Sequence, residues 1–548
     1  MTSTETGRPE NVRLVPGAMQ HWSDLDRQVV GASTAVRALV REVVSGAGRV
    51  AIVGAAPLDL ITGLADETPS LTVITRSIPD AVTVGELLQD VTGVQVVCGS
   101  AAQVEDTFDA VVVLADLAAV QSLEAEPVTW RAAYDDVRTL VADGGRLLLG
   151  IENELGLQRM TALRSRYTTD TDADWSVTAT FDASRPRSLE AVRELCAADD
   201  AARVEAAFPD WQQPTVLASV DPAPAGALRQ VLEAVVLASP SYRQLGADPT
   251  RVTRAAVLAG RLLDFASGWY VVTGLPRAGT ATVTESGGQG AVVSYTQDGP
   301  GAVRRVGQDG TERVVDVPQD ARLVSEDLLD AAAGGDLTAL RVAVRDFADG
   351  VRSRADGGVL PAEVADVRPD NVLRTADDLV VIAPAHTSAP VEDALITGLA
   401  DLVATLRARG ARHPWPAAID DATMLGNLVA MAGIDPQAAT GRTVPTTGQD
   451  TPLPAYDIPG LLAVVERLTH ANTALASKAA WFEQRLSVRE REMRARAEQH
   501  RRQLADASRG QEILRSRAED IRRSLTYRAG NVILGPVRNL RSRTRDKL

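Results

Sequence analysis

The chain has 548 residues, of which 45% are apolar and 24% are charged, and its formal net charge is −15. This composition predicts a soluble globular protein with two or three domains. Residues 1–15 lack the apolar core of a signal peptide, and no uncharged apolar stretch reaches the roughly 18–20 residues of a membrane span. We therefore expect a cytoplasmic protein.

The charge is unevenly distributed along the chain. Residues 485–548 hold 18 Lys and Arg against 8 Asp and Glu, a net of +10, which leaves −25 for the first 484 residues. Arginine is abundant and lysine nearly absent, as in proteins of GC-rich bacterial genomes. Cys98 and Cys196 have no C-x-x-C partner, and the five histidines are scattered, so buried thiols and no metal site are predicted.

The first segment alternates apolar, β-branched runs with stretches of helical period. Thr129 can cap a helix that ends at residues 143–145, a sequence Asp-Gly-Gly, and whose apolar face includes Val141. The alternation predicts βαβ units and a parallel sheet, the pattern of a Rossmann-like α/β domain over residues 1–225. The five strand candidates are Val50–Val53, Leu71–Ile74, Val94–Cys98, Ala110–Leu114 and Arg146–Ile151.

The second segment, residues 226–434, predicts an α+β domain. Residues 291–296 and 302–317 read as strands, with Asp309 and Gly310 forming a two-residue hairpin turn. An alanine-rich helix is expected from about Ser325 to Arg352. Residues 435–459, rich in Pro, Thr and Gly, predict a linker.

The third segment, residues 460–526, has the spacing of a coiled coil. Seam residues recur every 4 and 3 positions, and an extra four residues after Met493 form a stutter that locally unwinds the supercoil. Asn472 lies on the seam, where a buried amide favours one register and two strands. We expect a homo-oligomer through residues 461–525, with packing against the chain's own body as the alternative. The seam is Leu461, Val465, Leu468, Asn472, Leu475, Ala479, Phe482, Leu486, Arg489, Met493, Ala497, His500, Leu504, Ala507, Gln511, Leu514, Ala518, Ile521 and Leu525.

The basic tail, residues 527–548, mixes arginines with a few apolar side chains. Such a tail could rest on the anionic inner face of the membrane, or could simply be the solvated end of a coiled coil. Nucleic-acid binding is disfavoured, because aromatic stacking residues other than Tyr527 are lacking in the tail.

The first domain has neither a dinucleotide-binding G-x-G-x-x-G sequence nor a P-loop. Five stretches in order nevertheless resemble class I S-adenosylmethionine-dependent methyltransferases: VAIVGAA from residue 50, LTVITRS from 71, VQVVCGSA from 94, FDAVVVLADL from 108 and the strand that leads into IENELGL at 151–157. The last of these, together with residues 206–219, resembles a group of bacterial methyltransferase-like proteins associated with cell-surface glycan and polysaccharide biosynthesis. The resemblance implies S-adenosylmethionine as cofactor.

The resemblance also implies which residues line the site. Gly54, Ala55 and Ala56 would form the cofactor loop, with Thr75 on the ribose side and Ser100 on the adenine side. Ile52, Thr75 and Ser100 occupy positions where the family has carboxylates, so three acceptors are lost together. Each lost charged hydrogen bond weakens binding by about 1.5–3 kcal/mol.

Several polar residues near the strand ends have alternative interpretations. Glu152 and Asn153 could face the substrate, or could fix a turn by hydrogen bonds to the backbone. Asp59 or Asp66 could replace lost acceptors from the following helix, and Asp109 and Asp116 flank the fourth strand near the cleft. As helix N-terminal acids or surface charges, all four need no ligand.

In the second segment, Asp366, Pro369 and Asn371 resemble the D-x-x-P-x-N stretch of aminoglycoside-phosphotransferase-like kinases. No metal-binding aspartate follows, and no glycine-rich loop with a partner lysine precedes it, so a structural turn is the preferred interpretation. Two functions stay open for the whole chain. One is a methyltransferase, or a protein derived from one with weakened cofactor binding; the other is a non-catalytic coiled-coil scaffold for glycan-assembly enzymes at the membrane surface.

Overall fold

A computed structural model of the protein describes residues 8–530, with gaps at 27–28, 162–181, 198–201, 239–248, 277–278, 287–290, 319–320, 376–377, 384, 386, 409–410, 417–418 and 446–457. The chain divides into two units, Met1–Tyr456 and Asp457–Leu548. Among the described helices, none combines the length and the apolar character needed to cross a bilayer.

The first unit is built on a sheet of 13 strands in the order β1-β4-β3-β2-β5-β6-β9-β7-β8-β10-β11-β12-β13. The first six strands in this order run parallel, and β9 runs opposite to both of its neighbours, β6 and β7. The strands are β1 (Val12–Leu14), β2 (Arg49–Val53), β3 (Ser70–Thr75), β4 (Val94–Cys98), β5 (Phe108–Val113), β6 (Val141–Glu152), β7 (Arg203–Phe208), β8 (Val216–Ser219), β9 (Gly268–Thr273), β10 (Thr282–Ser286), β11 (Val292–Gln297), β12 (Ala302–Gly307) and β13 (Glu312–Asp316).

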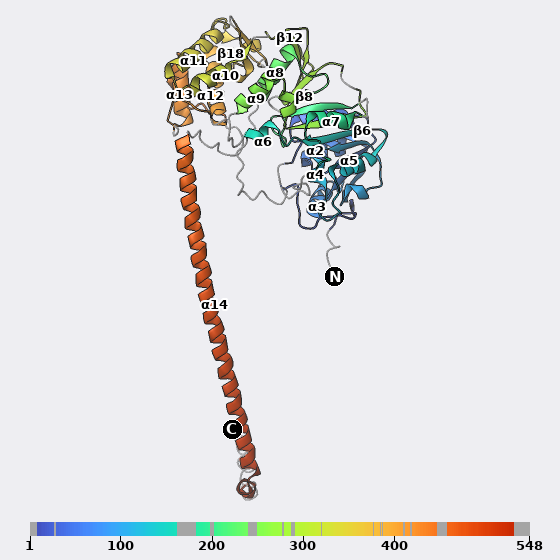
Figure 1. Cartoon of the computed structure of the whole chain (residues 1–548), viewed down its shortest axis with the longest axis vertical. Helices are drawn as coiled ribbons and strands as arrows, with labels where there is room; N and C mark the ends of the chain where they lie inside the picture. The colour runs from blue at the N-terminus through green and yellow to red at the C-terminus, as the bar shows by residue number, and fades with distance from the viewer. Residues whose placement is uncertain are drawn as a thin grey trace, which may run out of the picture. The chain divides into compact units, whose positions relative to one another are not determined.

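Helices cover both faces of the parallel part (Figure 1), because alternate residues of each buried strand point to opposite sides. Val50 and Ile52 pack with α1, α2 and α3, whereas Ala51 and Val53 belong to the core formed with α5, α7 and α8. The helices are α1 (Thr34–Val44), α2 (Leu58–Glu67), α3 (Ile78–Leu87), α4 (Leu117–Val120), α5 (Trp130–Thr139), α6 (Leu157–Thr161), α7 (Leu189–Cys196), α8 (Gly226–Ala238) and α9 (Pro249–Leu258).

The five predicted strands are confirmed as β2 to β6, and Thr129 caps α5 by accepting a hydrogen bond from the Ala132 amide. The predicted end of that helix was wrong. Val141 starts β6 instead of continuing α5, because Val141 pairs with Phe108 of β5. The hairpin at Asp309 and Gly310 is confirmed between β12 and β13, with Gly310 at φ +78°.

The sheet continues across residue 225, where the sequence predicts a domain boundary. Strand β9 inserts between β6 and β7, and β10 pairs with β8. A separate hydrophobic core begins only near Val324. It is formed by four helices, α10 (Val324–Ala333), α11 (Leu337–Arg352), α12 (Val391–Ala408) and α13 (Asp421–Met431). Two small sheets lie beside them. One consists of β14 (Arg322–Leu323), β16 (Val372–Arg374) and β17 (Leu379–Val381), and the other of β15 (Val359–Leu360) and β18 (Ala389–Pro390).

The alanine-rich helix expected from Ser325 to Arg352 is two helices. Gly335 has φ +74°, and Asp336 then caps α11 by accepting from the amides of Thr338 and Ala339. The second unit is a single long helix, α14 (Ile458–Arg523). The predicted basic tail falls outside the described residues from 531 onward.

Candidate functional site

The residues predicted to bind the cofactor lie at one edge of the sheet. Gly54, Ala55 and Ala56 follow β2, Thr75 ends β3 and Ser100 follows β4, and these three strands are parallel neighbours. The order of strands reverses between β2 and β5, and at such a switch point open α/β sheets bind their ligands beyond the carboxyl ends of the strands. The structure therefore brings the five residues predicted for the cofactor loop, the ribose side and the adenine side together at one edge of the sheet.

The turn after β2 is closed by a side chain. Gly54 has φ +89° and donates its N–H to the Ile74 carbonyl at 2.8 Å. A Cβ added to Gly54 would lie 2.4 Å from Cγ1 of Val120, at the end of α4. The space that a glycine opens for the close approach of a ligand is filled by this valine.

Residues 15–24, which we call the N-terminal strap, cross the carboxyl ends of β3 and β4. The Val15 amide donates to the Cys98 carbonyl at 2.8 Å, and the Ser100 amide donates to the Pro16 carbonyl at 2.9 Å. Further along, the Met19 amide donates to the Arg76 carbonyl at 2.8 Å. The backbone groups at the ends of these strands are thus satisfied by the chain itself.

Arg76 anchors the strap, and its side chain is only 5% exposed. Its Nε and Nη2 donate to the two carboxylate oxygens of Asp24 at 2.9 and 2.6 Å, and its Nη1 donates to the Gln121 carbonyl at 2.7 Å. The guanidinium also lies over the ring of Trp22, 5.0 Å from its centroid. A buried, bidentate ion pair of this geometry fixes the strap against the loop that follows α4.

Asp80 makes a second attachment from the start of α3. Its carboxylate accepts from the Ser23 hydroxyl and from the Asp24 amide, both at 2.7 Å. Burial raises the pKa of Asp80, and these hydrogen bonds oppose the rise.

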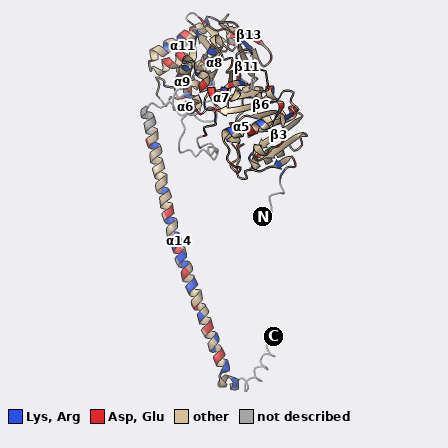
Figure 2. Ribbon diagram, turned by 45° about the vertical axis from the view of Figure 1, so that its right-hand side comes forward, with Lys and Arg blue, Asp and Glu red and all other residues tan. Residues whose placement is uncertain are grey.

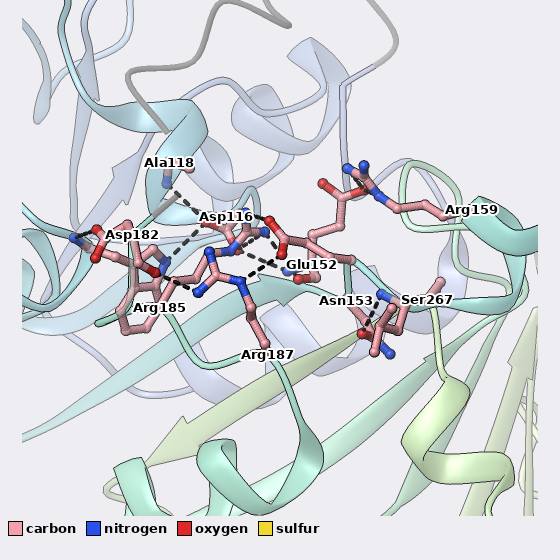
Figure 3. A network of polar contacts seen from close by, with 12 residues as sticks. Asp116, Ala118, Glu152, Asn153, Arg159, Asp182, Arg185, Arg187 and Ser267 are labelled. Carbon is pink, nitrogen blue, oxygen red and sulfur yellow. Dashed lines mark hydrogen bonds and ion pairs between the residues drawn. The ribbon is translucent and has the colours of Figure 1, made fainter. Parts of the chain in front are cut away.

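A saturated carboxylate lies at the end of β5. Asp116 is 4% exposed. Its Oδ1 accepts hydrogen bonds from the Ala118 amide at 2.9 Å and from Nε1 of Trp130 at 3.1 Å. Its Oδ2 accepts from the Glu152 amide at 3.0 Å and from Nη2 of Arg185 at 3.1 Å. Figure 3 shows these donors converging on it. Four donors fill the acceptor capacity of a carboxylate, so Asp116 is not free to act as a base.

The network extends to a segment far along the chain. Arg185 is 7% exposed and also donates to Glu154 at 2.9 Å, and Arg187 donates to the other oxygen of Glu154 at 2.8 Å. Asp182 accepts from the Trp130 amide at 2.6 Å. These bonds tie residues 182–187 across the ends of β5 and β6, on the side where a substrate would approach in this type of sheet.

Glu152 and Asn153 have different roles. Glu152 accepts from Nε and Nη2 of Arg159 at 2.9 and 2.6 Å; burial raises its pKa, and Arg159 opposes the rise. Asn153 is 1% exposed, donates to the carbonyls of Asp264 and Ala266 at 2.9 and 2.8 Å, and accepts from the Leu155 amide at 2.9 Å. The amide of Asn153 therefore fixes the turn after β6.

The remaining candidates are structural as well. Asp59 pairs with Arg37 at 2.7 Å on an exposed surface. In the second segment, Asn371 donates to the carbonyls of Asp366 and Ala383 at 2.9 and 2.7 Å, and the Asp366 carboxylate pairs with Arg368 at 2.9 Å. The kinase-like stretch is thus held as a turn.

Sequence reasoning missed the arginines of this edge and the strap. Arg76 directly follows Thr75, and an arginine at the end of a buried apolar strand was the available signal, because such a side chain requires a carboxylate partner. The partner, Asp24, lies 52 positions away in a segment without periodicity, so no local pattern pointed to it.

Comparisons with known proteins give one kind of likeness. No protein-family model and no curated protein matches the sequence. Among solved structures, the N-methyltransferase NodS of Bradyrhizobium japonicum, solved with S-adenosylhomocysteine, is 22% identical over 22% of this chain and 65% of its own, with a TM-score of 0.19. Phosphoethanolamine N-methyltransferase 2 of Haemonchus contortus, solved with S-adenosylmethionine, is 10% identical over 44% of this chain and 52% of its own, at 0.25. The CcbJ methyltransferase of Streptomyces caelestis is 9% identical over 62% and 83%, at 0.19.

The chain spans less than two thirds of the length of the first two of these proteins, and identities of this size concern the fold alone. The fold class is a Rossmann-like α/β sheet. The strand order supports this independently: five parallel neighbours, β4-β3-β2-β5-β6, are followed by the reversed β9 and then by β7. Two of these proteins were solved with S-adenosylhomocysteine or S-adenosylmethionine.

The residues at this edge do not fit that cofactor. S-adenosylmethionine carries a sulfonium, an ammonium and a carboxylate, and its cationic groups need carboxylate partners, whereas the buried Arg76 at the end of β3 already takes up the Asp24 carboxylate. The carboxylates of Asp24 and Asp116, which lie beside the edge, are each paired with a buried arginine. Because these carboxylates are already saturated by arginines and amides, they leave a cationic ligand no free acceptor.

Proposed function

We propose that the first unit is a methyltransferase-derived fold that no longer holds S-adenosylmethionine, and that the protein acts as a non-catalytic scaffold. The observation that carries the proposal is the N-terminal strap, which is hydrogen-bonded across the ends of β3 and β4 and locked by the Arg76–Asp24 pair. The strap lies where the adenosyl group would contact Thr75 and Ser100.

The energetics favour the closed edge. Displacing the strap breaks a buried ion pair, which costs about 3–5 kcal/mol when one partner stays buried. The three missing carboxylates remove a further 1.5–3 kcal/mol each, roughly. A micromolar site corresponds to about −8.2 kcal/mol, so losses of this size leave no measurable affinity.

The finer assignment is a role in cell-surface glycan or polysaccharide assembly. It is supported by the resemblance of the stretches at 151–157 and 206–219. In the structure the ring of Trp211, from the second stretch, lies against Gly150, which directly precedes the first stretch, and against Gly268 of β9; an added Cβ would come within 2.9 and 2.3 Å of the ring. We propose that the scaffold brings glycan-assembly enzymes together, and that the basic tail rests on an anionic membrane surface.

The test is a calorimetric titration of the full-length protein with S-adenosylhomocysteine up to about 1 mM, the range in which weakened binding remains detectable. We expect no saturable heat. Hydrogen exchange at residues 54–60 and 98–103, measured with and without the ligand, should also be unchanged. Saturable binding with protection at those residues would instead establish a working cofactor site and favour the methyltransferase alternative.

A further inference from the structure

Helix α14 carries a long stripe of exposed apolar side chains. Val465, Leu475, Leu486 and Met493 are 58, 64, 62 and 71% exposed, and Leu504, Leu514 and Ile521 are 60, 66 and 59% exposed. A shallow groove runs along the same stripe beside Val465, Leu468 and Asn472. Soluble helices seldom leave such a stripe uncovered, so a partner surface is required.

The spacing of the stripe is symmetric about Met493. On either side, the seam residues are separated by 4, 3, 4, 3, 4, 3, 4, 3 and 4 positions. The stutter therefore falls in the middle of the seam. A parallel pair tolerates a stutter at any position, but an antiparallel pair stays in register through it only when the stutter is central.

We propose that α14 pairs with the α14 of a second copy of this chain in antiparallel orientation, centred on Met493. Each seam residue then faces the residue at the same distance on the other side of Met493. Leu486 faces His500 of the partner subunit, Phe482 faces Leu504 of the partner subunit, and Val465 faces Ile521 of the partner subunit. Ala479 meets Ala507 of the partner subunit, which lets the two backbones approach closely.

Charges beside the seam complement one another in this orientation. Residues flanking the seam on the same side face each other in an antiparallel pair, which places Glu483 beside Arg501 of the partner subunit and Glu492 beside Arg496 of the partner subunit. The ion pairs within the described part of α14 itself use Glu490, Glu498 and Asp506 instead. Figure 2 shows the acidic and basic residues interspersed along the helix.

The parallel orientation in register is less favourable. It does bring Lys478 beside Glu483 of the partner subunit, and Arg485 beside Glu490 of the partner subunit. However, it also sets Arg496 beside Arg501 of the partner subunit, and it buries Arg489 against Arg489 of the partner subunit inside the seam. In the antiparallel pair Arg489 faces the small Ala497 of the partner subunit, so its stem can lie along the seam while its charge reaches water.

The two seam amides are also compatible with this orientation. Asn472 faces Leu514 of the partner subunit, and in the next layer Leu475 faces Gln511 of the partner subunit. The amides of Asn472 and Gln511 thus fall in successive layers on opposite helices, where they can hydrogen-bond across the seam. Because the chain enters each helix at Ile458, the pair sends the two Met1–Tyr456 units to opposite ends.

Cysteine cross-linking of the full-length protein distinguishes the orientations. Cys98 and Cys196 are buried, so the unmodified chain serves as the uncross-linked control. Met493→Cys should form a disulfide dimer in either orientation. Mixed Leu486→Cys and His500→Cys proteins should form a heterodimer in roughly tenfold excess over the Leu486→Cys homodimer, because in the antiparallel pair the two 486 positions are about 21 Å apart, beyond disulfide reach.

Two outcomes would overturn the proposal. A dominant Leu486→Cys homodimer would show parallel pairing. A monomeric mass by light scattering, together with no Met493→Cys dimer, would show that α14 packs elsewhere. Since the readout does not involve a cofactor, it is independent of the calorimetric titration.

Discussion

The anchoring role of Arg76 can be tested by Arg76→Met, which keeps the apolar stem and removes the charged hydrogen bonds. The substitution leaves Asp24 with the Nε1 donor of Trp22 at 2.8 Å and with a side chain 15% exposed. Because Asp24 keeps one donor and some solvent, we take the lower end of the cost of breaking a buried pair, about 3 kcal/mol.

This loss converts into a small but measurable change in melting temperature. The compact unit spans Met1–Tyr456, and at about 2.1 cal/mol/K per residue its unfolding entropy is roughly 1 kcal/mol/K. The expected fall in Tm is therefore about 3 °C. If the strap opens locally, hydrogen exchange at the Met19 amide should accelerate by up to about 100-fold, since each 1.4 kcal/mol is a factor of ten.

The matched control is Arg13→Met, in β1 next to the strap. Arg13 pairs with Asp106 at 3.4 Å, and both side chains are almost half exposed. Exposed pairs of this kind contribute about 0–1 kcal/mol, so Tm should change by less than about 1 °C. Equal shifts for Arg76→Met and Arg13→Met, or unchanged exchange in the strap, would refute the anchoring role.

Three further predictions concern buried groups of the first unit. Burial raises the pKa of Glu205 to about 7, from a value near 4.5 in the unfolded chain. Folding therefore favours the neutral carboxyl: this contribution to stability is fully present below pH 4.5 and is lost as the pH rises through 7. Glu205→Gln should match the native protein near pH 5 and exceed its stability by about 3 kcal/mol above pH 8, measured by denaturant titration; a pH-independent difference would contradict this. Asn153→Ala leaves backbone groups unsatisfied and should cost about 3 kcal/mol in the same assay, against almost nothing for the exposed Leu155→Ala. Gly54→Ala should cost about 3 kcal/mol, from a positive φ and the clash with Val120, and a Val120→Ala background should remove only the clash.

The parallel strands were predictable because their signal is local. A buried strand needs a short β-branched run between turn residues, and Val94–Cys98 has the same bounds in the sequence prediction and in β4. The hairpin at Asp309 and Gly310 was equally legible, because a two-residue turn needs that pair of residues. Val141 was misassigned because helical spacing continues by chance into β6, and only its pairing with Phe108 decides.

The closure of the site was not predictable from local pattern. The strap contacts the ends of β3 and β4 through backbone groups, which every residue type possesses, and the residues joined, such as Val15 and Cys98 or Met19 and Arg76, lie far apart in the sequence. Likewise, β9 inserts between β6 and β7 after more than a hundred intervening residues. What the sequence did reveal was that Ile52, Thr75 and Ser100 are uncharged at the positions where the resemblance implies carboxylates.

The uncharged strand ends and the buried arginine are physically coupled. Carboxylates at the ends of adjacent strands repel one another and are tolerated where a cationic ligand neutralises them. Thr75 and Ser100 provide no such carboxylates, and Arg76 can turn inward only if the chain supplies one. Asp24 supplies it from the strap, with Asp80 fixing the strap at its other contact. Restoring a single carboxylate, as in Thr75→Asp, should therefore not restore binding of S-adenosylhomocysteine: the new charge would compete with Asp24 for Arg76 while the strap stays in place. Binding recovered by Thr75→Asp alone, in the same calorimetric titration, would show that the strap is no barrier.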